Sequence, residues 1–408
     1  MFKVLSFITC IIEIILSFWT TTRTLLFLLK KKSHIQMCYA KMKLKLIIPC
    51  LLEQDRIIPT IKWLRNVFGI DTEIIIVTTS NEKKIPSIPT TYEVIQVYLS
   101  EHPTDNICLI NYPCTGGQMV DQLNYAISEL KRRNVSWDYV GIYNADSRPQ
   151  KGTKEALLKL MDNRVPIIQQ YSSMTSNIQY VSPLMKSFAL YQTNYEIKTG
   201  LLGCMLPTLF CAPHVVGHGL FIRNDILEML GGFPTQHWCE DIFLSFILYN
   251  RSIAITALDV LEEAEVPIDY KAQVGQHMTW FKTAFDVMGM GRFETQTLTV
   301  KGYWYLFQRL LRSLMWLTSS FFILFSIIYS LLVSDSILTV LSLSSFIFMC
   351  VSEYGTTLII ISYLGIRHST NNYLFGFLFV PLARILSFVG PFFSFLQKEK
   401  KPTRHTRQ

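Results

Sequence analysis

Apolar residues are concentrated at the two ends of the chain, with a more polar stretch between them. The first apolar run covers Val4–Leu29, and later runs cover Leu314–Val333, Ile337–Leu364 and Tyr373–Leu396. Each run is long enough to cross a bilayer, which takes about 20 residues in a helix. Glu13 and Arg23 interrupt the first run, so a tilted or interfacial helix remains an alternative there. In the last run, the interruptions are Pro381, Arg384, Gly390 and Pro391.

Basic residues next to these runs predict which side of the membrane each part faces. Lys30, Lys31 and Lys32 follow the first run, and five further basic residues occupy the last eleven positions. Positive residues favour the cytoplasmic side, so both the central domain and the C-terminal tail are expected there. Three simple crossings after the domain would leave the tail outside. One of the last two runs is therefore expected to be re-entrant or to cross twice.

Short apolar strands alternate with amphipathic helices through the middle of the chain. The expected strands are 44–49, 73–77, 94–98, 139–143 and 166–171, and the expected helices are 54–67, 118–131 and 152–161. This alternation predicts an α/β domain with a largely parallel sheet and helices on both faces. Pro183–Leu202 is predicted either as an amphipathic helix on the membrane or as a packed helix of the domain. Lys301–Trp316 has a clearer interfacial pattern of aromatic and basic residues.

Composition limits the classes of protein. The 408 residues are only 17% charged, with a net charge of +8 and a mean hydropathy of +0.28. The positive charge is heaviest beside the apolar runs, which favours contact with anionic lipid over nucleic acid. Nine cysteines form no Cys-x-x-Cys pair. Reduced cytoplasmic thiols are therefore expected, without a zinc site.

Two acidic positions carry candidate chemistry. Asp146 closes the segment Asn144-Ala145-Asp146 at the end of an expected strand, where a carboxylate can hold a divalent cation. The alternative is an ordinary strand-end turn. Asp241 is a candidate general base for an acceptor hydroxyl. The alternative there is a helix N-terminal acid stabilised by the helix dipole.

Gln276 and Trp280 lie four residues apart, on one face of a helix. A tryptophan face can cover a sugar ring while the glutamine amide bonds its hydroxyls. Packing of Trp280 against membrane-proximal helices is the alternative.

Taken in order, these motifs resemble those of the family-2 glycosyltransferases, in the branch of membrane polysaccharide and glycolipid synthases. The similarity covers about residues 44–285. It is carried by IIPCLLEQDRI with Pro49 and Glu53, GGQMVDQLNYAI with Asn124, YNADSRP, the paired glutamines 169 and 170, GHGLFIRNDILEMLGGF, WCEDIFLSF and QHMTW. YNADSRP is similar to a D-x-D metal motif, and QHMTW to Q-x-x-R-W.

The resemblance implies a GT-A fold, a donor nucleotide sugar bound with Mn²⁺ or Mg²⁺, and inversion at the anomeric carbon. It implies Asp241 as the base and Asp146 as the metal ligand. The residues that it implies for donor binding are Pro49, Glu53, Asn124, Asn144 and Asp146. Those that it implies for acceptor binding are Gln169, His218, Gly219, Glu240, Gln276 and Trp280.

Three single positions and one four-residue segment depart from the family pattern. Asn144 replaces the first acid of D-x-D, and Thr279 replaces the arginine of Q-x-x-R-W. Met119 stands where a lysine is usual, and Thr78-Thr79-Ser80-Asn81 lacks the acid expected beside the nucleotide base. These changes remove charge from the donor site and leave its base and sugar open.

The expected organisation is a membrane helix at 1–30, a cytoplasmic GT-A domain at 44–300, an interface helix with C-terminal membrane helices at 301–397, and a basic tail at 398–408. The expected activity is hexosyl transfer from a donor such as a UDP-sugar to a growing polysaccharide or glycan, at a bacterial cytoplasmic membrane. Two alternatives remain open. The first is transfer of one sugar to a lipid, such as a polyprenyl phosphate or a ceramide-like lipid. The second is a non-catalytic subunit of a polysaccharide export assembly.

Overall fold

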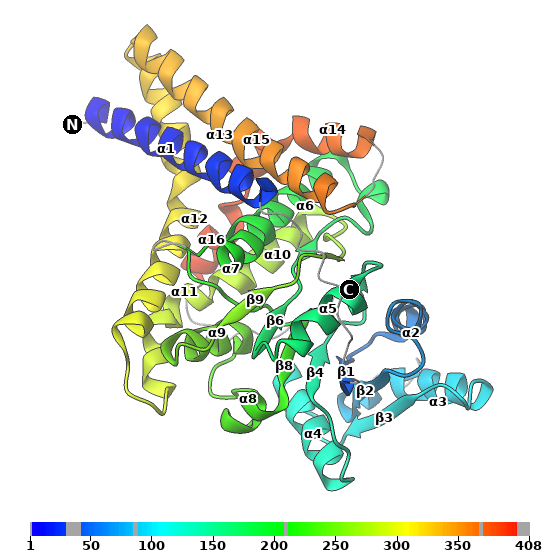
Figure 1. Cartoon of the computed structure of the whole chain (residues 1–408). Helices are drawn as coiled ribbons and strands as arrows, with labels where there is room; N and C mark the ends of the chain where they lie inside the picture. Colours follow the sequence, from blue (N-terminus) through cyan, green and yellow to red (C-terminus); the bar gives the residue numbers. More distant parts are fainter. Residues whose placement is uncertain (1, 30–41, 85–88, 208–210, 367–369, 398–408) are drawn as a thin grey trace.

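The computed structural model describes residues 2–29, 42–84, 89–207, 211–366 and 370–397. Its centre is a seven-stranded sheet in the order β3-β2-β1-β4-β8-β6-β9 (Figure 1). The strands are β1 (Leu44–Pro49), β2 (Glu73–Thr79), β3 (Ile107–Tyr112), β4 (Tyr139–Ile142), β6 (Ile167–Gln169), β8 (Leu220–Arg223) and β9 (Ile255–Ala257). A second, three-stranded sheet contains β5 (Arg148–Pro149), β10 (Glu262–Glu263) and β7 (Ser172–Ser173).

The large sheet is mixed, with a parallel half at one side. Strands β3, β2, β1 and β4 are parallel, whereas β8 runs antiparallel to both of its neighbours, β4 and β6. The carboxyl ends of β1, β2 and β4 therefore lie at one edge, where parallel sheets usually bind their ligands.

Helices cover both faces of this sheet. Along β1, Leu46 and Ile48 point to one face and Ile47 to the other, and all three are fully buried. Apolar residues of α2 (Gln54–Phe68), α3 (Thr91–Glu101) and α5 (Thr153–Asp162) form the core on the first face. Those of α4 (Met119–Arg132), α8 (Asn224–Met229) and α9 (Glu240–Asn250) form the core on the second.

Most predicted elements are confirmed to within two residues at each end, including β1, β2, α2, α4 and α5. The strand predicted at Val94–Tyr98 is wrong, because this segment lies in α3. Thr90 and Glu93 form a reciprocal cap at its start, with Thr90 N–H donating to Glu93 Oε2 at 2.7 Å. Ile95 and Tyr98, three residues apart, then face the core. The third parallel strand is β3, which begins at Ile107.

The segment predicted at Pro183–Leu202 folds as three consecutive pieces packed into the molecule. They are α6 (Pro183–Tyr195), a π-helical turn (Glu196–Leu201) and α7 (Leu202–Met205). Ser182 caps the start of α6, where Pro183 fits the first helical position. π-Turns occur often at functional sites, and the first residue of this one, Glu196, is buried.

Three helices are long and apolar enough to cross a membrane. They are α1 (Phe2–Leu29), α12 (Val300–Leu332) and α13 (Ser336–Tyr363). The predicted interface helix and the run after it form one continuous helix, α12. The last predicted run is broken into α14 (Thr370–Leu378), α15 (Val380–Leu386) and α16 (Val389–Leu396), with a bend of 54° after α14.

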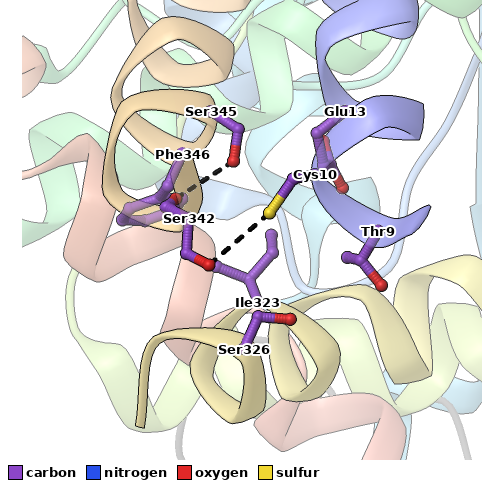
Figure 2. A pocket seen from close by; sticks show the side chains of 8 residues that line it. All are labelled: Thr9, Cys10, Glu13, Ile323, Ser326, Ser342, Ser345 and Phe346. Atoms are coloured by element: carbon purple, nitrogen blue, oxygen red, sulfur yellow. Dashed lines mark hydrogen bonds between the residues drawn. The ribbon is translucent and has the colours of Figure 1, made fainter. Parts of the chain in front are cut away.

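Helices α1, α12 and α13 lie side by side at one end of the molecule (Figure 1). Figure 2 shows a small polar pocket between them, lined by Thr9, Cys10, Glu13, Ile323, Ser326, Ser342, Ser345 and Phe346. The Cys10 Sγ and Ser342 Oγ atoms are 3.5 Å apart. Small polar residues let membrane helices approach closely and bond to one another.

The broken C-terminal segment packs on the α/β domain. A Cβ added to Gly390 of α16 would lie 2.4 Å from His277 Cβ of α10 (Tyr270–Phe281), so the two helices touch there through backbone. Gly376 of α14 similarly meets the backbone of Lys186 in α6. The bent segment is therefore fixed to the domain that carries the candidate site.

Candidate active site

The candidate site begins where β1 ends. Pro49 is buried at the end of β1, and Glu53 precedes the first turn of α2. Buried Glu82 holds this corner, because its carboxylate accepts from Leu52 N–H at 2.7 Å and from Thr91 N–H at 2.6 Å. Glu82 comes directly after Asn81, at the end of the segment that lacks the family's acid. Its hydrogen bonds to backbone N–H groups show that it stabilises the loop after β1.

The Asn144–Asp146 loop follows β4 and is held in a tight turn. Asn144 N–H donates to Ser147 Oγ, and Ser147 N–H donates to Asn144 O, each at 3.1 Å. Thr60 of α2 donates to the Ala145 carbonyl and accepts from Arg148 Nη1 at 2.7 Å. The turn holds the half-buried Asp146 at the sheet edge, near the charges of Arg148 and His218.

Asn124 lies on α4 and bonds a loop on the other side of the site. Its Nδ2 donates to Phe233 O and its Oδ1 accepts from Phe233 N–H, both at 2.8 Å. Gly232 has a φ of +107°, and an added Cβ would lie 2.7 Å from Asn124 Oδ1. The side-chain amide of Asn124, predicted to bind the donor, therefore bonds to the backbone at Phe233, a few residues before the Trp238–Asp241 segment.

Gln169, fully buried at the end of β6, organises the loop before β8. Its Nε2 donates to His218 O and Gln170 O, both at 2.8 Å, and its Oε1 accepts from Val216 N–H at 3.0 Å. Gly219 completes the loop with a φ of +60°, where a Cβ would lie 2.4 Å from Gln170 O. Gln169 and Gly219 thus determine the position of His218.

His218 pairs with Glu262, a residue that the sequence analysis did not identify. The Nδ1 of His218 bonds to Oε1 of Glu262, and Ser172 Oγ donates to the same oxygen at 2.9 Å. Burial lowers the pKa of His218, but the Glu262 charge and hydrogen bond outweigh it and raise the pKa to about 9. The imidazole is therefore protonated at neutral pH beside Asp146.

Glu196, on the π-helical turn, is a second residue that the sequence analysis missed. It is 8% exposed, and its Oε2 has no hydrogen-bond partner among the described residues. Burial raises its pKa to about 7, with contributions from Glu262 and Asp241, whereas His218 opposes the rise. Glu196 therefore lies within electrostatic range of both His218 and Asp241.

Asp241 lies in the first turn of α9, half-buried. Its Oδ1 accepts from Ile242 N–H at 2.7 Å and from Cys239 Sγ at 3.1 Å. A Cβ on Gly217 would lie 4.0 Å from its Oδ2, so this carboxylate adjoins the loop that carries His218. Glu240 precedes it and is buried. The loop Val216–Gly219 thus joins the neighbourhoods of Asp146 and Asp241.

Gln276 and Trp280 lie on α10. The Gln276 Oε1 accepts from Gln192 Nε2 of α6 at 2.7 Å. The Trp280 side chain is 43% exposed, although its ring contacts His277 with centroids 5.9 Å apart. A substantial part of the indole is therefore free to meet a ligand. Thr279, at the family's arginine position, bonds to its own helix through Gly275 O.

The part of the chain that is described contains no group of three or more His, Cys, Asp or Glu side chains arranged to hold a metal. Asp146, with the Asn144 amide nearby in sequence, offers hard oxygen ligands of the kind that Mg²⁺ and Mn²⁺ accept. This donor set suits a cation whose remaining ligands come from phosphate oxygens. The eight described cysteines form no disulfide with one another, and Cys38 lies outside the described residues.

Comparison with known proteins identifies the fold. No family model and no curated protein sequence matches the chain. Among solved structures, the chain is similar to a mannosyltransferase from Pyrobaculum calidifontis in complex with GDP-mannose and Mn²⁺, at 13% identity and a TM-score of 0.56. The alignment covers 98% of this chain and 100% of that one.

Two further structures overlap less well. One is residues 1–349 of TarS from S. aureus with UDP-GlcNAc, at 12% identity and a TM-score of 0.40, covering 87% of this chain and 92% of that 1–349 chain. The other is glucosyl-3-phosphoglycerate synthase from Mycobacterium tuberculosis with Mg²⁺ and UDP, at 15% identity and a TM-score of 0.37, covering 62% and 80%. The first similarity, over nearly the whole chain, confirms the predicted fold. The protein has a GT-A glycosyltransferase fold with a mixed, largely parallel sheet.

Proposed function

We propose that this chain is a membrane-bound, inverting glycosyltransferase that moves a sugar from a nucleotide-sugar donor to a growing polysaccharide or glycan. The observation that supports this most strongly is the loop Val216–Gly219. Its Gly217 adjoins the Asp241 carboxylate, and its His218 lies within range of the Asp146 charge. A donor-side acid and an acceptor-side acid therefore belong to one site, as sugar transfer requires.

In this proposal Asp241 takes the proton of the acceptor hydroxyl as the hydroxyl oxygen attacks the anomeric carbon. The bond from that carbon to the nucleoside diphosphate breaks, and its electron pair leaves with the diphosphate. The bonds from Ile242 N–H and Cys239 Sγ hold the carboxylate in place. Gln276 and Trp280 support the acceptor sugar through one amide and one exposed aromatic face.

Asp146 and Asn144 would hold the divalent cation, Mn²⁺ or Mg²⁺. When bound, the cation supplies neutralisation of the diphosphate charge. The mannosyltransferase of similar fold is a complex with GDP-mannose and Mn²⁺, which supports a metal-bound nucleotide sugar here. Pro49 and Glu53 border the donor side, at the corner that Glu82 holds.

We also propose a membrane topology. With the α/β domain in the cytoplasm, α12 would cross outward and α13 would cross back. The bent segment α14–α16, packed on α6 and α10, would then be re-entrant. This arrangement places the basic tail, which lies outside the described residues, in the cytoplasm, and it resolves the conflict that the charge pattern raises.

The central test uses the two acids. The purified protein is incubated with a panel of GDP- and UDP-sugars and Mn²⁺ or Mg²⁺, with released nucleotide and nucleotide affinity as readouts. Asp241→Asn should lower transfer by about 10²–10⁴-fold, as the loss of a general base does, while nucleotide binding stays nearly normal. Asp146→Ala should lose metal-dependent nucleotide binding. Normal transfer by Asp241→Asn, or unchanged nucleotide affinity in Asp146→Ala, would remove that residue from its role.

A non-catalytic export subunit would release no nucleotide from any donor. Transfer of one sugar to a lipid would instead give a product that does not grow with time. The length of the product therefore separates this alternative from polysaccharide extension.

A further inference from the structure

Two of the candidate membrane helices, α1 and α13, hold the π-helical turn Glu196–Leu201. Lys198 of this turn forms an ion pair with Glu353 of α13, and the two side chains are 26% and 11% exposed. Arg23 of α1 donates from Nη1 to Lys198 O and from Nη2 to Leu206 O, each at 3.3 Å. Because the turn bonds to both helices, its position depends on how they pack against it.

The helix that leads into the turn, α6, is also fixed to α13. Thr357 Oγ1 of α13 donates to Asn194 Oδ1 of α6 at 2.9 Å, and both residues are buried. The two helices lie side by side in Figure 1. A charged side chain in a membrane helix is costly and usually marks a functional contact. The ion-pair partner of Glu353 lies in the segment between β7 and β8, next to the candidate site.

The inner side of the π-turn packs on the segment that joins β6 to β7. A Cβ added to Gly200 would lie 2.3 Å from Cε1 of Tyr171, so the backbone of the turn touches this buried ring. In α6, just before the turn, Thr193 Oγ1 accepts from Met174 N–H at 2.9 Å. A displacement of the turn would therefore move the β6–β7 segment as well.

Ser172, at the start of β7, links the turn to the candidate site. Its backbone N–H donates to the Glu196 carboxylate, which lies within range of the charges of His218 and Asp241. Its Oγ donates to Glu262 Oε1 at 2.9 Å, and the same oxygen bonds to His218 Nδ1. Contacts thus run without interruption from α13, through the π-turn, to the loop that carries His218.

We propose that Lys198 and Glu353 are positioning residues for sugar transfer. Their ion pair holds the π-turn against α13 and thereby places the Glu196 carboxylate at Ser172, beside the residues that orient His218. This inference rests on the proposed function, because it assigns to the same site a support that comes from the membrane helices.

The proposed support predicts a specific kinetic pattern. The Asp146 loop is held by Ser147 and by Thr60 of α2, so nucleotide binding should not depend on the π-turn. The loop that carries His218 adjoins Asp241 through Gly217, so the rate of transfer should depend on it. Loss of the ion pair should therefore lower kcat and leave the affinity for the donor nucleotide nearly unchanged.

A double-mutant cycle in the purified full-length protein tests this pattern, with nucleotide release assayed well below the melting temperature. Lys198→Met and Glu353→Gln should each lower kcat about tenfold and change nucleotide affinity by less than about twofold. The double variant should be about as slow as the slower single variant, because both substitutions remove one interaction. Effects that multiplied to about a hundredfold would show that the two residues act independently, and would overturn the proposal.

A single substitution leaves one charge of the pair without its partner, which destabilises a buried site. The double variant avoids this problem, so it decides the question if a single variant fails to fold. A double variant with normal kcat, or one in which nucleotide affinity falls together with kcat, would overturn the proposal. Lys198→Arg, which keeps the charge, should retain most of the rate.

Lys3→Met is the matched control. It removes another ion pair of α1, between Lys3 Nζ and Asp335 Oδ2 at 2.7 Å, near the opposite end of this helix from Arg23. Because this pair joins α1 to the connection between α12 and α13, its loss should leave kcat within about twofold of the wild type. A loss of kcat equal to that of Lys198→Met would mean that any weakening of the membrane helices slows the enzyme.

Hydrogen exchange separates this inference from the proposed function, because it needs no substrate. In the double variant, amides should exchange faster both in residues 194–206 and in the loop 216–219, whereas Lys3→Met should change neither segment. Faster exchange confined to residues 194–206 would refute a role in positioning the loop. A wild-type protein that releases no nucleotide from any donor would refute the proposed function, and the exchange rates would still decide whether the ion pair supports this loop.

Discussion

Replacing Gln169 with leucine should damage the site without touching either acid. Leucine has nearly the same volume as glutamine and fits an interior position, so the change mainly removes hydrogen bonds. The Val216 N–H loses its acceptor, and the carbonyls of His218 and Gln170 lose their donor. These groups lie in the loop that joins the neighbourhoods of Asp146 and Asp241.

The magnitude follows from the groups left unpaired. Each buried N–H or carbonyl without a partner costs about 1–3 kcal/mol, and the buried leucine returns about 1–2 kcal/mol by its apolar surface. A net loss of about 3 kcal/mol is expected. At about 2–4 °C per kcal/mol for a domain of this size, the melting temperature should fall by roughly 6–12 °C.

Two measurements check this expectation in detergent-solubilised protein. Thermal unfolding gives the change in stability, and nucleotide release, assayed well below the melting temperature, gives the activity of the protein that remains folded. Activity should fall at least about tenfold, because the loop shifts relative to Asp241. Gln96→Leu is the matched control, since Gln96 is exposed on α3 and its amide donates to Tyr92 Oη on the same helix. A Gln169→Leu variant that melts and reacts like the wild type would refute this account of the loop.

Three other substitutions test the remaining assignments. Asn144→Asp should strengthen Mn²⁺ binding in the presence of nucleotide by about tenfold, or about 1.4 kcal/mol; weaker binding by calorimetry would exclude Asn144 as a ligand. Trp280→Ala should raise the acceptor concentration needed for half-maximal rate by about tenfold, because aromatic stacking on flat ligands contributes about 1–3 kcal/mol. Hydrolysis of the donor by water should be retained. A large loss of donor binding would instead place Trp280 on the nucleotide side. A single cysteine introduced at position 408, in a background without reactive thiols, should resist membrane-impermeant reagents in intact cells; rapid labelling would contradict the re-entrant segment.

The sequence predicts the parallel half of the sheet well because its strands are short, continuous apolar runs bounded by turn residues. It fails at residues 94–98, where Val94, Ile95, Val97 and Tyr98 fit both a buried strand and one side of a helix. The reciprocal cap between Thr90 and Glu93 decides for the helix. Where an apolar pattern is compatible with both a strand and a helix, as here, the local capping hydrogen bonds favour the helix.

The candidate site is harder to predict because its members come together only through the tertiary fold. Glu262 sits in a two-residue strand, 44 positions after His218, and nothing near it in the sequence marks it as a partner. Glu196 is buried on the side of α6 that also buries Gln192 and Thr193, and only the tertiary fold brings this side within range of His218 and Asp241. The pair Gln169 and Gln170 can be recognised as a motif, but the motif does not say that the Gln169 amide faces the protein's own backbone.

The departures from the family pattern gain a physical meaning once the site is assembled. Met119 begins α4, and its Cε would lie 3.3 Å from a Cβ at Gly217, so an apolar group borders the site where the family has a lysine. Thr279 likewise brings no charge. His218 is protonated, but Glu262 already pairs with it, so together they add almost no net positive charge. Under the proposed function, neutralisation of the leaving diphosphate therefore depends more heavily on the divalent cation at Asp146 than it would in a site that kept both basic residues.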